Sequence, residues 1–169
     1  LVDMARRTVR INQLEVKVSF LHADVNDVIR FIKQDSVDVI TCNPPYFKLS
    51  ESSFTNELDA FAIARHEIHL TLDQLMKQTS HLLKMKGKAY FVHRPDRLME
   101  ILETMRNNRI APKKLQFIYP KQNKEANMIL IEGIKDGKED GFRVLPPLVV
   151  YNEEGEYSQK VKDVLYGEQ

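Results

Sequence analysis

The sequence predicts an α/β fold in which strands and helices alternate along the chain. Short apolar runs rich in β-branched residues, typical of strands, recur from the first third of the sequence onward. Stretches with apolar residues at helical spacing lie between several of these runs. In addition, 43% of the 169 residues are hydrophobic, so a single domain can bury a substantial core. A domain built on a central sheet accounts for these three observations.

The first quarter of the chain contains two predicted helices and two predicted strands. Residues 1–13 place apolar side chains on one face and are typical of a helix, and residues 16–21 alternate as a strand does. Asp24 follows that strand, where it can cap a helix over residues 25–32. Residues 37–42 form the second predicted strand, which ends at an Asn and two prolines.

The middle of the chain predicts a helix, a strand and a second helix. Thr71 and Gln74 have the spacing of a capping box, and the apolar residues behind them recur at helical spacing up to residue 83. Gly87 is expected to end that helix, and residues 88–93 to form a strand. Pro95 is suited to the first position of the next helix.

The last part of the chain predicts two strands, over residues 114–119 and 127–134, joined by a hairpin-like loop. A short helix is expected over residues 160–166. The single Cys42 cannot form an internal disulfide, and its place in a strand run favours a buried structural thiol.

The stretch from Asn43 to Tyr46 carries the most specific chemistry. The side chain of Asn43 offers a carbonyl acceptor, and Pro44 keeps its carbonyl while lacking an N–H. Two neighbouring acceptors can hold both hydrogens of an amino group and orient its lone pair toward an electrophile. Tyr46 can stack on a flat ring. Pro45 stiffens the loop between these groups. The motif therefore predicts chemistry on an amino group attached to an aromatic ring or a carbonyl.

This motif resembles the Asn-Pro-Pro-Tyr signature of S-adenosylmethionine-dependent amino-group methyltransferases. The Phe47 that follows it is similar to the residue at this place in the adenine-modifying branch of that family. The context is similar to that of the bacterial tRNA1(Val) adenine N6-methyltransferase group over residues 37–47, 64–67, 87–97, 125–128 and 131–133. The resemblance covers nearly the whole chain. It implies a Rossmann-like class I methyltransferase with a mostly parallel sheet and an antiparallel hairpin at one edge.

The resemblance also implies a set of site residues. Asn43, Pro44, Pro45 and Tyr46 are expected to be catalytic. Asp24, Val25 and Asn43 are expected to contact S-adenosylmethionine. The substrate is expected to meet Tyr46, Phe47, Arg65, His66, Lys121 and Lys124. For Asp24 the alternative is a plain helix cap, for Arg65 and His66 a structural ion pair, and for the two lysines a solvated turn.

The family's first strands, and the Gly-rich turn that approaches the cofactor, have no counterpart in the sequence. Its six glycines lie at positions 87, 133, 137, 141, 155 and 167, which is too late for that turn. Residues 1–169 are therefore expected to be the carboxyl-terminal part of one methyltransferase domain, inactive by itself. Its open sheet edge could pair two chains, giving a strand-paired or swapped dimer.

Charge distribution points to a nucleic-acid partner more than net charge does. The formal net charge is +1, but residues 84–124 hold eleven Lys and Arg against three acidic residues. With the resemblance, this favours tRNA as the partner. No long apolar stretch, signal peptide or metal-ligand spacing is apparent, so a cytoplasmic protein without membrane or metal is expected.

Two alternatives to a tRNA adenine N6-methyltransferase remain at this point. A protein-glutamine N5-methyltransferase has the same amino-clamping loop, although Phe47 and the basic stretch count against it. The second alternative is a non-catalytic RNA-binding module on a methyltransferase scaffold, although such a module has no evident need for the Asn-Pro-Pro-Tyr loop.

Overall fold

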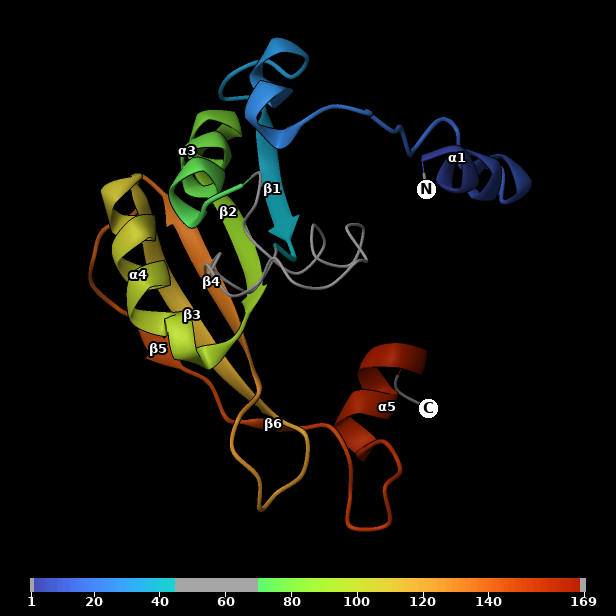
Figure 1. Cartoon of the computed structure of the whole chain (residues 1–169), viewed down its shortest axis with the longest axis vertical. Coiled ribbons are helices and arrows are strands. Elements are labelled where there is room, and N and C mark those ends of the chain that lie inside the picture. Colours follow the sequence, from blue (N-terminus) through green and yellow to red (C-terminus); the bar gives the residue numbers. More distant parts are fainter. Residues whose placement is uncertain (1, 45–69, 168–169) are drawn as a thin grey trace, which may run out of the picture.

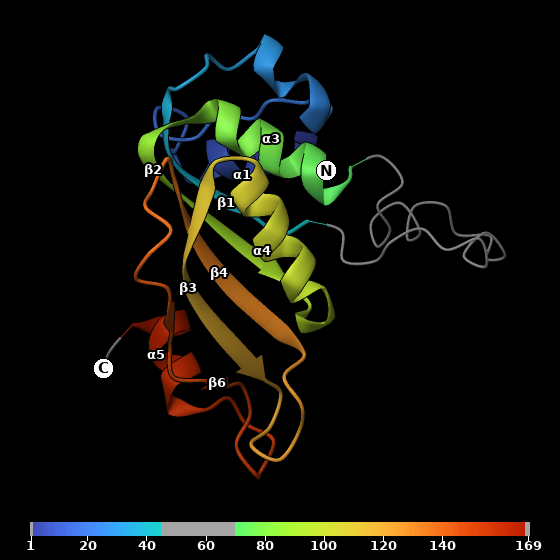
Figure 2. The same cartoon turned by 90° about the vertical axis from the view of Figure 1, so that its left-hand side faces the viewer.

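The computed structural model describes residues 2–44 and 70–167, which form a six-stranded sheet with helices packed against one face (Figures 1 and 2). The strands are β1 (Val37–Cys42), β2 (Leu83–His93), β3 (Ile110–Tyr119), β4 (Met128–Lys135), β5 (Arg143–Val144) and β6 (Leu148–Val149). The α-helices are α1 (Val2–Ile11), α3 (Leu72–Leu82), α4 (Leu98–Asn107) and α5 (Gln159–Tyr166). Two 3-10 helices, η1 (Val25–Arg30) and η3 (Pro95–Arg97), complete the described elements.

The strands are ordered β1-β2-β4-β3-β5, with β6 also paired to β3. β1 runs parallel to β2, whereas β4 is antiparallel to both β2 and β3. The directions of β1, β2 and β3 are therefore the same, and their carboxyl ends meet at one edge of the sheet. The short strands β5 and β6 pair in parallel with β3 beyond this group.

Alternation along the strands separates two rows of side chains. Phe91, Ile131 and Leu115 are neighbours across β2, β4 and β3, and all three are buried. They belong to a core cluster that includes side chains of α3 and α4, such as Met76 and Met105. Because successive side chains point to opposite faces, the next row lies on the face away from these helices.

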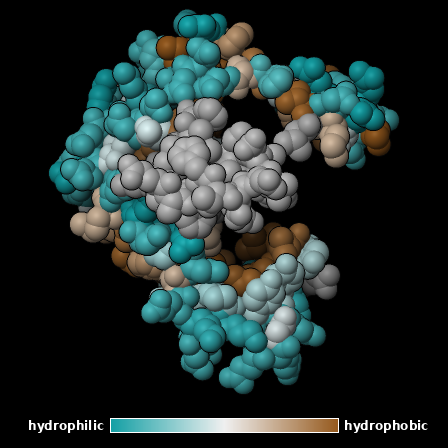
Figure 3. Space-filling model, in the orientation of Figure 1, coloured by the Kyte–Doolittle hydropathy of each residue, from teal (hydrophilic) through white to brown (hydrophobic). Residues whose placement is uncertain are grey.

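That second row is Tyr90, Glu132 and Lys114, followed by Val92, Leu130 and Gln116. In Figure 1, α1 and α5 lie on this side of the sheet, at its two ends. Neither belongs to the buried core cluster that covers the other face. Within residues 2–44 and 70–167, this face is thus the less covered one. Figure 3 shows hydrophobic residues (brown) gathered between the main body of the molecule and the lobe that contains α5.

Several predictions from the sequence are confirmed. The capping box is present: the Gln74 N–H donates to Thr71 Oγ1 at 3.2 Å, and the Thr71 N–H donates to Gln74 Oε1 at 2.9 Å. Helices occur at the amino end and over Gln159–Tyr166, and β3 and β4 form the expected antiparallel pair.

Three predictions are wrong. Residues 16–21 pair with no strand in the described part of the chain, because alternation makes a strand only where a neighbour completes its hydrogen bonds. The helix expected over residues 25–32 is the short 3-10 helix η1. Gly87 does not end α3, since that helix stops at Leu82 and β2 begins with the next residue.

Candidate active site

Asn43 and Pro44 lie directly after β1, at the sheet edge where β2 and β3 also end. Asn43 is exposed, and Pro44 is buried. This is the position predicted from the sequence, where a strand stopped by proline presents polar groups at the carboxyl edge of an α/β sheet. The other motif residues, Pro45, Tyr46 and Phe47, lie outside the described residues, as do Arg65 and His66.

The residue before Asn43 is a half-buried thiol. Burial raises the pKa of Cys42, so the neutral thiol dominates at neutral pH. A neutral, partly enclosed thiol is a poor nucleophile. The assignment of Cys42 as a structural residue therefore agrees with its surroundings.

A cavity of about 560 Å³ extends from Asn43 over the less covered face of the sheet. Its wall is mostly apolar and includes Val92, Leu130 and Leu145. Its polar lining residues include Tyr90, Glu132 and Lys114, which are neighbours across β2, β4 and β3. Most of the cavity is thus a sheet surface, with Asn43 at its margin.

Glu132 is the electrostatic centre of this surface. Lys114 Nζ donates to Glu132 Oε2 at 3.0 Å, and the Tyr90 hydroxyl is a second hydrogen-bond partner. Burial of Glu132 opposes its ionisation, but these two hydrogen bonds, together with the charges of Lys114 and Lys88, outweigh burial and lower the pKa of the carboxyl group. Burial and the Glu132 carboxylate together raise the pKa of Tyr90. The cluster was not predicted from the sequence, because it depends on which residues of three strands lie in register.

Asp24 and Val25 do not line the cavity that contains Asn43. Asp24 Oδ1 accepts from the Asn26 N–H at 2.8 Å and caps η1, so the capping role expected for it is confirmed. Asn26 in turn accepts through its carbonyl from Gln78 of α3 at 3.4 Å. Both Asp24 and Val25 are exposed, as a contact with a small molecule requires.

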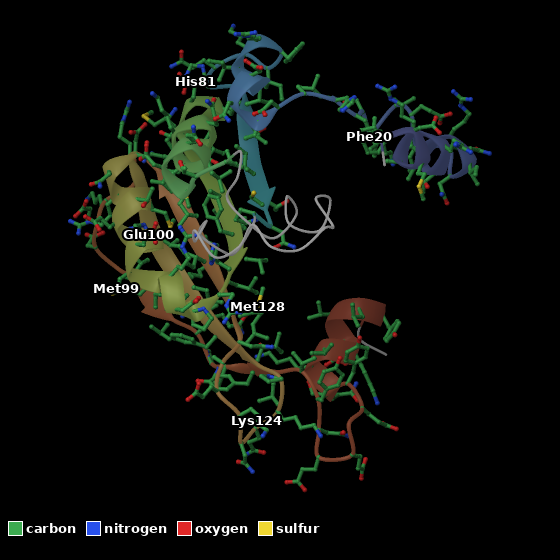
Figure 4. The ribbon with its side chains drawn as sticks, viewed as in Figure 1. Phe20, His81, Met99, Glu100, Lys124 and Met128 are labelled. Atoms are coloured by element: carbon green, nitrogen blue, oxygen red, sulfur yellow. The ribbon has the colours of Figure 1, made fainter. Side chains whose placement is uncertain are left out.

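Folding neutralises most of the basic stretch from residue 84 to residue 124. Seven of its eleven cations pair with acids: Lys84 with Asp38, Arg94 with Asp96, Arg97 with Glu100, Arg106 with Glu139, Arg109 with Asp136, Lys113 with Asp140 and Lys114 with Glu132. Lys121 and Lys124 form no ion pair among the described residues. They lie in the loop that follows the carboxyl end of β3, where Figure 4 labels Lys124. Because β1 and β3 run in the same direction, Asn43 follows β1 on the same side of the sheet.

Within residues 2–44 and 70–167, no group of three or more His, Cys, Asp or Glu is placed to hold a metal ion. Across the same residues, no helix combines the length and apolar character needed to span a membrane.

The fold is that of a class I S-adenosylmethionine-dependent methyltransferase. A predicted O-methyltransferase from Agrobacterium tumefaciens superposes with a TM-score of 0.73 at 18% identity, covering 98% of this chain and 72% of that one. Geranyl diphosphate C-methyltransferase from Streptomyces coelicolor superposes with a TM-score of 0.56 at 12% identity, covering 79% and 60%. At these identities the superpositions establish the fold alone.

Sequence comparison confirms the resemblance to tRNA1(Val) (adenine(37)-N6)-methyltransferases. The protein of that name from Aliivibrio salmonicida is 31% identical over 112 residues, which is 66% of this chain and 47% of the relative. The one from Vibrio vulnificus is 31% identical over 114 residues, which is 68% and 46%. The aligned parts span about half the length of these curated relatives. No protein-family model matches the chain.

Proposed function

We propose that the chain is part of a single-domain methyltransferase that transfers a methyl group from S-adenosylmethionine to the N6 amino group of an adenine in tRNA. The placement of Asn43 and Pro44 at the carboxyl edge of the sheet carries this proposal. It is supported by similarity to relatives named for adenine N6 methylation of a tRNA.

In the proposed reaction, the side-chain carbonyl of Asn43 and the backbone carbonyl of Pro44 accept the two hydrogens of the amino group. This orients the nitrogen lone pair toward the methyl group, and the main catalytic contribution is positioning. S-adenosylmethionine supplies an electrophilic methyl group on a sulfonium. As the nitrogen–carbon bond forms, the carbon–sulfur bond breaks with its electron pair left on sulfur, and the nitrogen then loses one proton to water.

The remaining site residues are proposed from the resemblance. The exposed Asp24 carboxylate and Val25 side chain suit an adenine, which offers amino hydrogens and an apolar edge, so they would hold that part of the cofactor. Pro45 and Tyr46 would complete the clamp, with Tyr46 and Phe47 stacking on an extruded base. Arg65, His66, Lys121 and Lys124 would meet the RNA.

The experiment is methyl transfer by the complete protein to tRNA that lacks the modification, with the methylated nucleoside identified by mass spectrometry. Asn43→Ala is expected to lower kcat about 100-fold or more, since one preorganised polar group at a reacting centre contributes on that order. Asn43 is one of several expected contacts with the cofactor, so cofactor affinity measured by calorimetry is expected to fall far less than kcat. Asn107→Ala, at the exposed end of α4, is the matched control. Normal turnover by Asn43→Ala would refute the mechanism.

We also infer that this chain by itself forms a strand-paired or swapped dimer. In the described part of the chain β1 pairs with β2 alone, and the side chain of Val39 is 52% exposed. An open edge of this kind pairs readily with another strand. Val39→Lys should give a monomer by light scattering, and a monomeric unaltered chain would contradict the inference.

The proposal includes a cytoplasmic protein that needs no metal. Positioning of an amino group by two carbonyl acceptors requires no Lewis acid. Methylation should therefore be unchanged after treatment with EDTA, and its loss, with recovery on adding Mg²⁺, would contradict this part.

A further inference from the structure

A groove of about 460 Å³ lies between the β3–β4 loop and the hairpin formed by residues 150–158. Lys121 and Lys124 line one side of it, and Tyr151 lines the other. Both segments follow the carboxyl ends of β3 and β6, which run parallel. The groove therefore lies on the side of the sheet where Asn43 ends β1. Figure 4 shows Lys124 on the loop beyond the end of β3.

Backbone hydrogen bonds fix the two sides of the groove to each other. The N–H of Val150 donates to the carbonyl of Tyr119 at 2.8 Å, and that of Tyr151 donates to Pro120 at 3.0 Å. Tyr151 is thus held against the residue that immediately precedes Lys121. The hairpin is closed by the Asn152 N–H, which donates to the Glu156 carbonyl at 2.9 Å. This arrangement is preorganised, so binding there would order few backbone dihedrals.

The hairpin presents a stacked pair of tyrosines. The ring centroids of Tyr151 and Tyr157 are 5.3 Å apart, with 14° between the ring planes. Both side chains remain more than a third exposed, at 37% and 39%. A stacked, exposed aromatic pair beside cations is the combination used to bind unpaired nucleotides, in which bases stack and phosphates meet lysine.

Charge in the groove favours an anion over a neutral partner. Lys121 and Lys124 are exposed and form no ion pair in the described part of the chain, unlike seven other cations of the basic stretch. Glu156, in the hairpin turn, is already paired with Lys162 at 3.3 Å. Among the residues that the structure describes, the charged ones that line the groove are therefore two lysines, Lys121 and Lys124, and one acid, Glu153.

We propose that this groove docks unpaired nucleotides of the RNA substrate. A base stacks on Tyr151, which lines the groove and whose ring is stacked on that of Tyr157, and the neighbouring phosphates contact Lys121 and Lys124. This inference rests on the proposed function for the identity of the ligand. Beyond the proposed function, it adds a role in RNA binding for the two tyrosines. It also specifies that the RNA bound here is a single-stranded loop and not a duplex.

The test is binding of RNA by this chain, measured by fluorescence anisotropy with a labelled stem-loop carrying an adenine-containing loop and with a duplex of the same length. Tyr151→Leu removes the aromatic face that lines the groove but keeps apolar bulk, and it should weaken stem-loop binding about tenfold. Tyr151→Phe should bind as the unaltered chain does. Tyr166→Leu is the matched control, because Tyr166 is exposed on α5 and does not line the groove. Melting curves of each variant check that it folds.

The lysines are tested by salt dependence. Lys124→Ala should reduce the slope of log affinity against log salt by about one, as expected for one lost phosphate contact. Lys138→Ala should leave the slope unchanged, since Lys138 follows β4 at the opposite edge of the sheet.

Three results would overturn the inference: no RNA binding by the chain, equal binding of stem-loop and duplex, or unchanged stem-loop affinity in folded Tyr151→Leu. None of these results tests the role of Asn43, which is measured by methyl transfer with the complete protein. Conversely, RNA binding that depends on Tyr151, without methylation of tRNA by the complete protein, would refute the proposed activity and support the docking groove.

Discussion

Lys135, the last residue of β4, donates a hydrogen bond to the carboxylate of Asp35, which lies just before β1. The same ammonium group donates to the Leu83 carbonyl at 2.8 Å. One buried lysine therefore joins the beginnings of β1 and β2 to the end of β4, across three adjacent strands. The contact holds the amino edge of the sheet together, opposite the edge that carries Asn43.

Lys135→Met should destabilise the protein by about 1–3 kcal/mol, because the carbonyl of the buried Leu83 loses its hydrogen bond from Lys135. Asp35 is half exposed, so loss of its ion pair should add little. Urea unfolding of the two chains measures the difference in free energy of unfolding. Lys138→Met is the control for a surface lysine and should change stability by less than about 0.5 kcal/mol. Equal stability of Lys135→Met and the unaltered chain would show that water replaces the ammonium group.

Stability in acid should depend on Glu132. Hydrogen bonds from Lys114 and Tyr90, acting against burial, hold the pKa of Glu132 below its ordinary value of 4.5. A carboxyl group whose pKa is lower in the folded state stabilises the fold fully above its unfolded pKa. That stabilisation is lost as pH falls through the lower, folded pKa.

Glu132→Gln should therefore show a shallower loss of melting temperature than the unaltered chain as pH falls below about 4.5. Tyr90→Phe removes one donor, so the pKa of Glu132 should move back toward its ordinary value and the acid dependence should weaken partly. Melting curves between pH 3 and pH 7 measure both effects. Identical pH dependence in all three chains would mean that the Glu132 cluster does not form.

Gly133 lies in β4 where no side chain fits. A Cβ there would meet Ile110 Cγ2 at 2.5 Å and would also collide with the end of the Met105 side chain. Both side chains are fully buried, but Met105 meets the Cβ with the end of an unbranched chain, whereas Ile110 is β-branched and stiff at the start of β3. Gly133→Ala should cost about 1–3 kcal/mol in free energy of unfolding, as overpacking does.

Ile110→Ala in the same chain should relieve the collision. The double variant should then be more stable than the sum of the two single effects, because the two residues share one contact. Denaturant unfolding of the four chains gives this coupling. Additive effects would show that strand β4 shifts and leaves Ile110 in place.

Local patterns predicted the helices well where a residue pair defined their ends. Thr71 and Gln74 fixed the start of α3 because the capping box is made within four residues. The prediction that Gly87 ends α3 is wrong, because β2 begins directly after Leu82. The glycine allows close packing instead. A Cβ at Gly87 would lie 2.8 Å from the Lys84 carbonyl oxygen.

Contacts between distant segments could not be predicted in the same way. The position of Asn43 after a strand was predictable from the two prolines, whereas the cluster of Tyr90, Lys114 and Glu132 requires the register of three strands. The same holds for residues 16–21, whose alternation indicates a strand but says nothing of a neighbour to pair with. Hydrogen-bond partners from elsewhere in the chain decide these cases.

Ser158 is expected to control the order of α5. Its hydroxyl donates to the Val149 carbonyl at 2.6 Å and accepts from the Val161 N–H at the start of the helix. α5 has eight residues and no buried side chain, so little else holds it against β6. Ser158→Ala should therefore speed amide hydrogen exchange in residues 161–166 about fivefold, corresponding to about 1 kcal/mol for a lost cap, and leave exchange in β2 and β4 unchanged. Ser158→Thr keeps the hydroxyl and should exchange as the unaltered chain does. Uniformly faster exchange throughout the sheet would instead mean that α5 is part of the cooperative core.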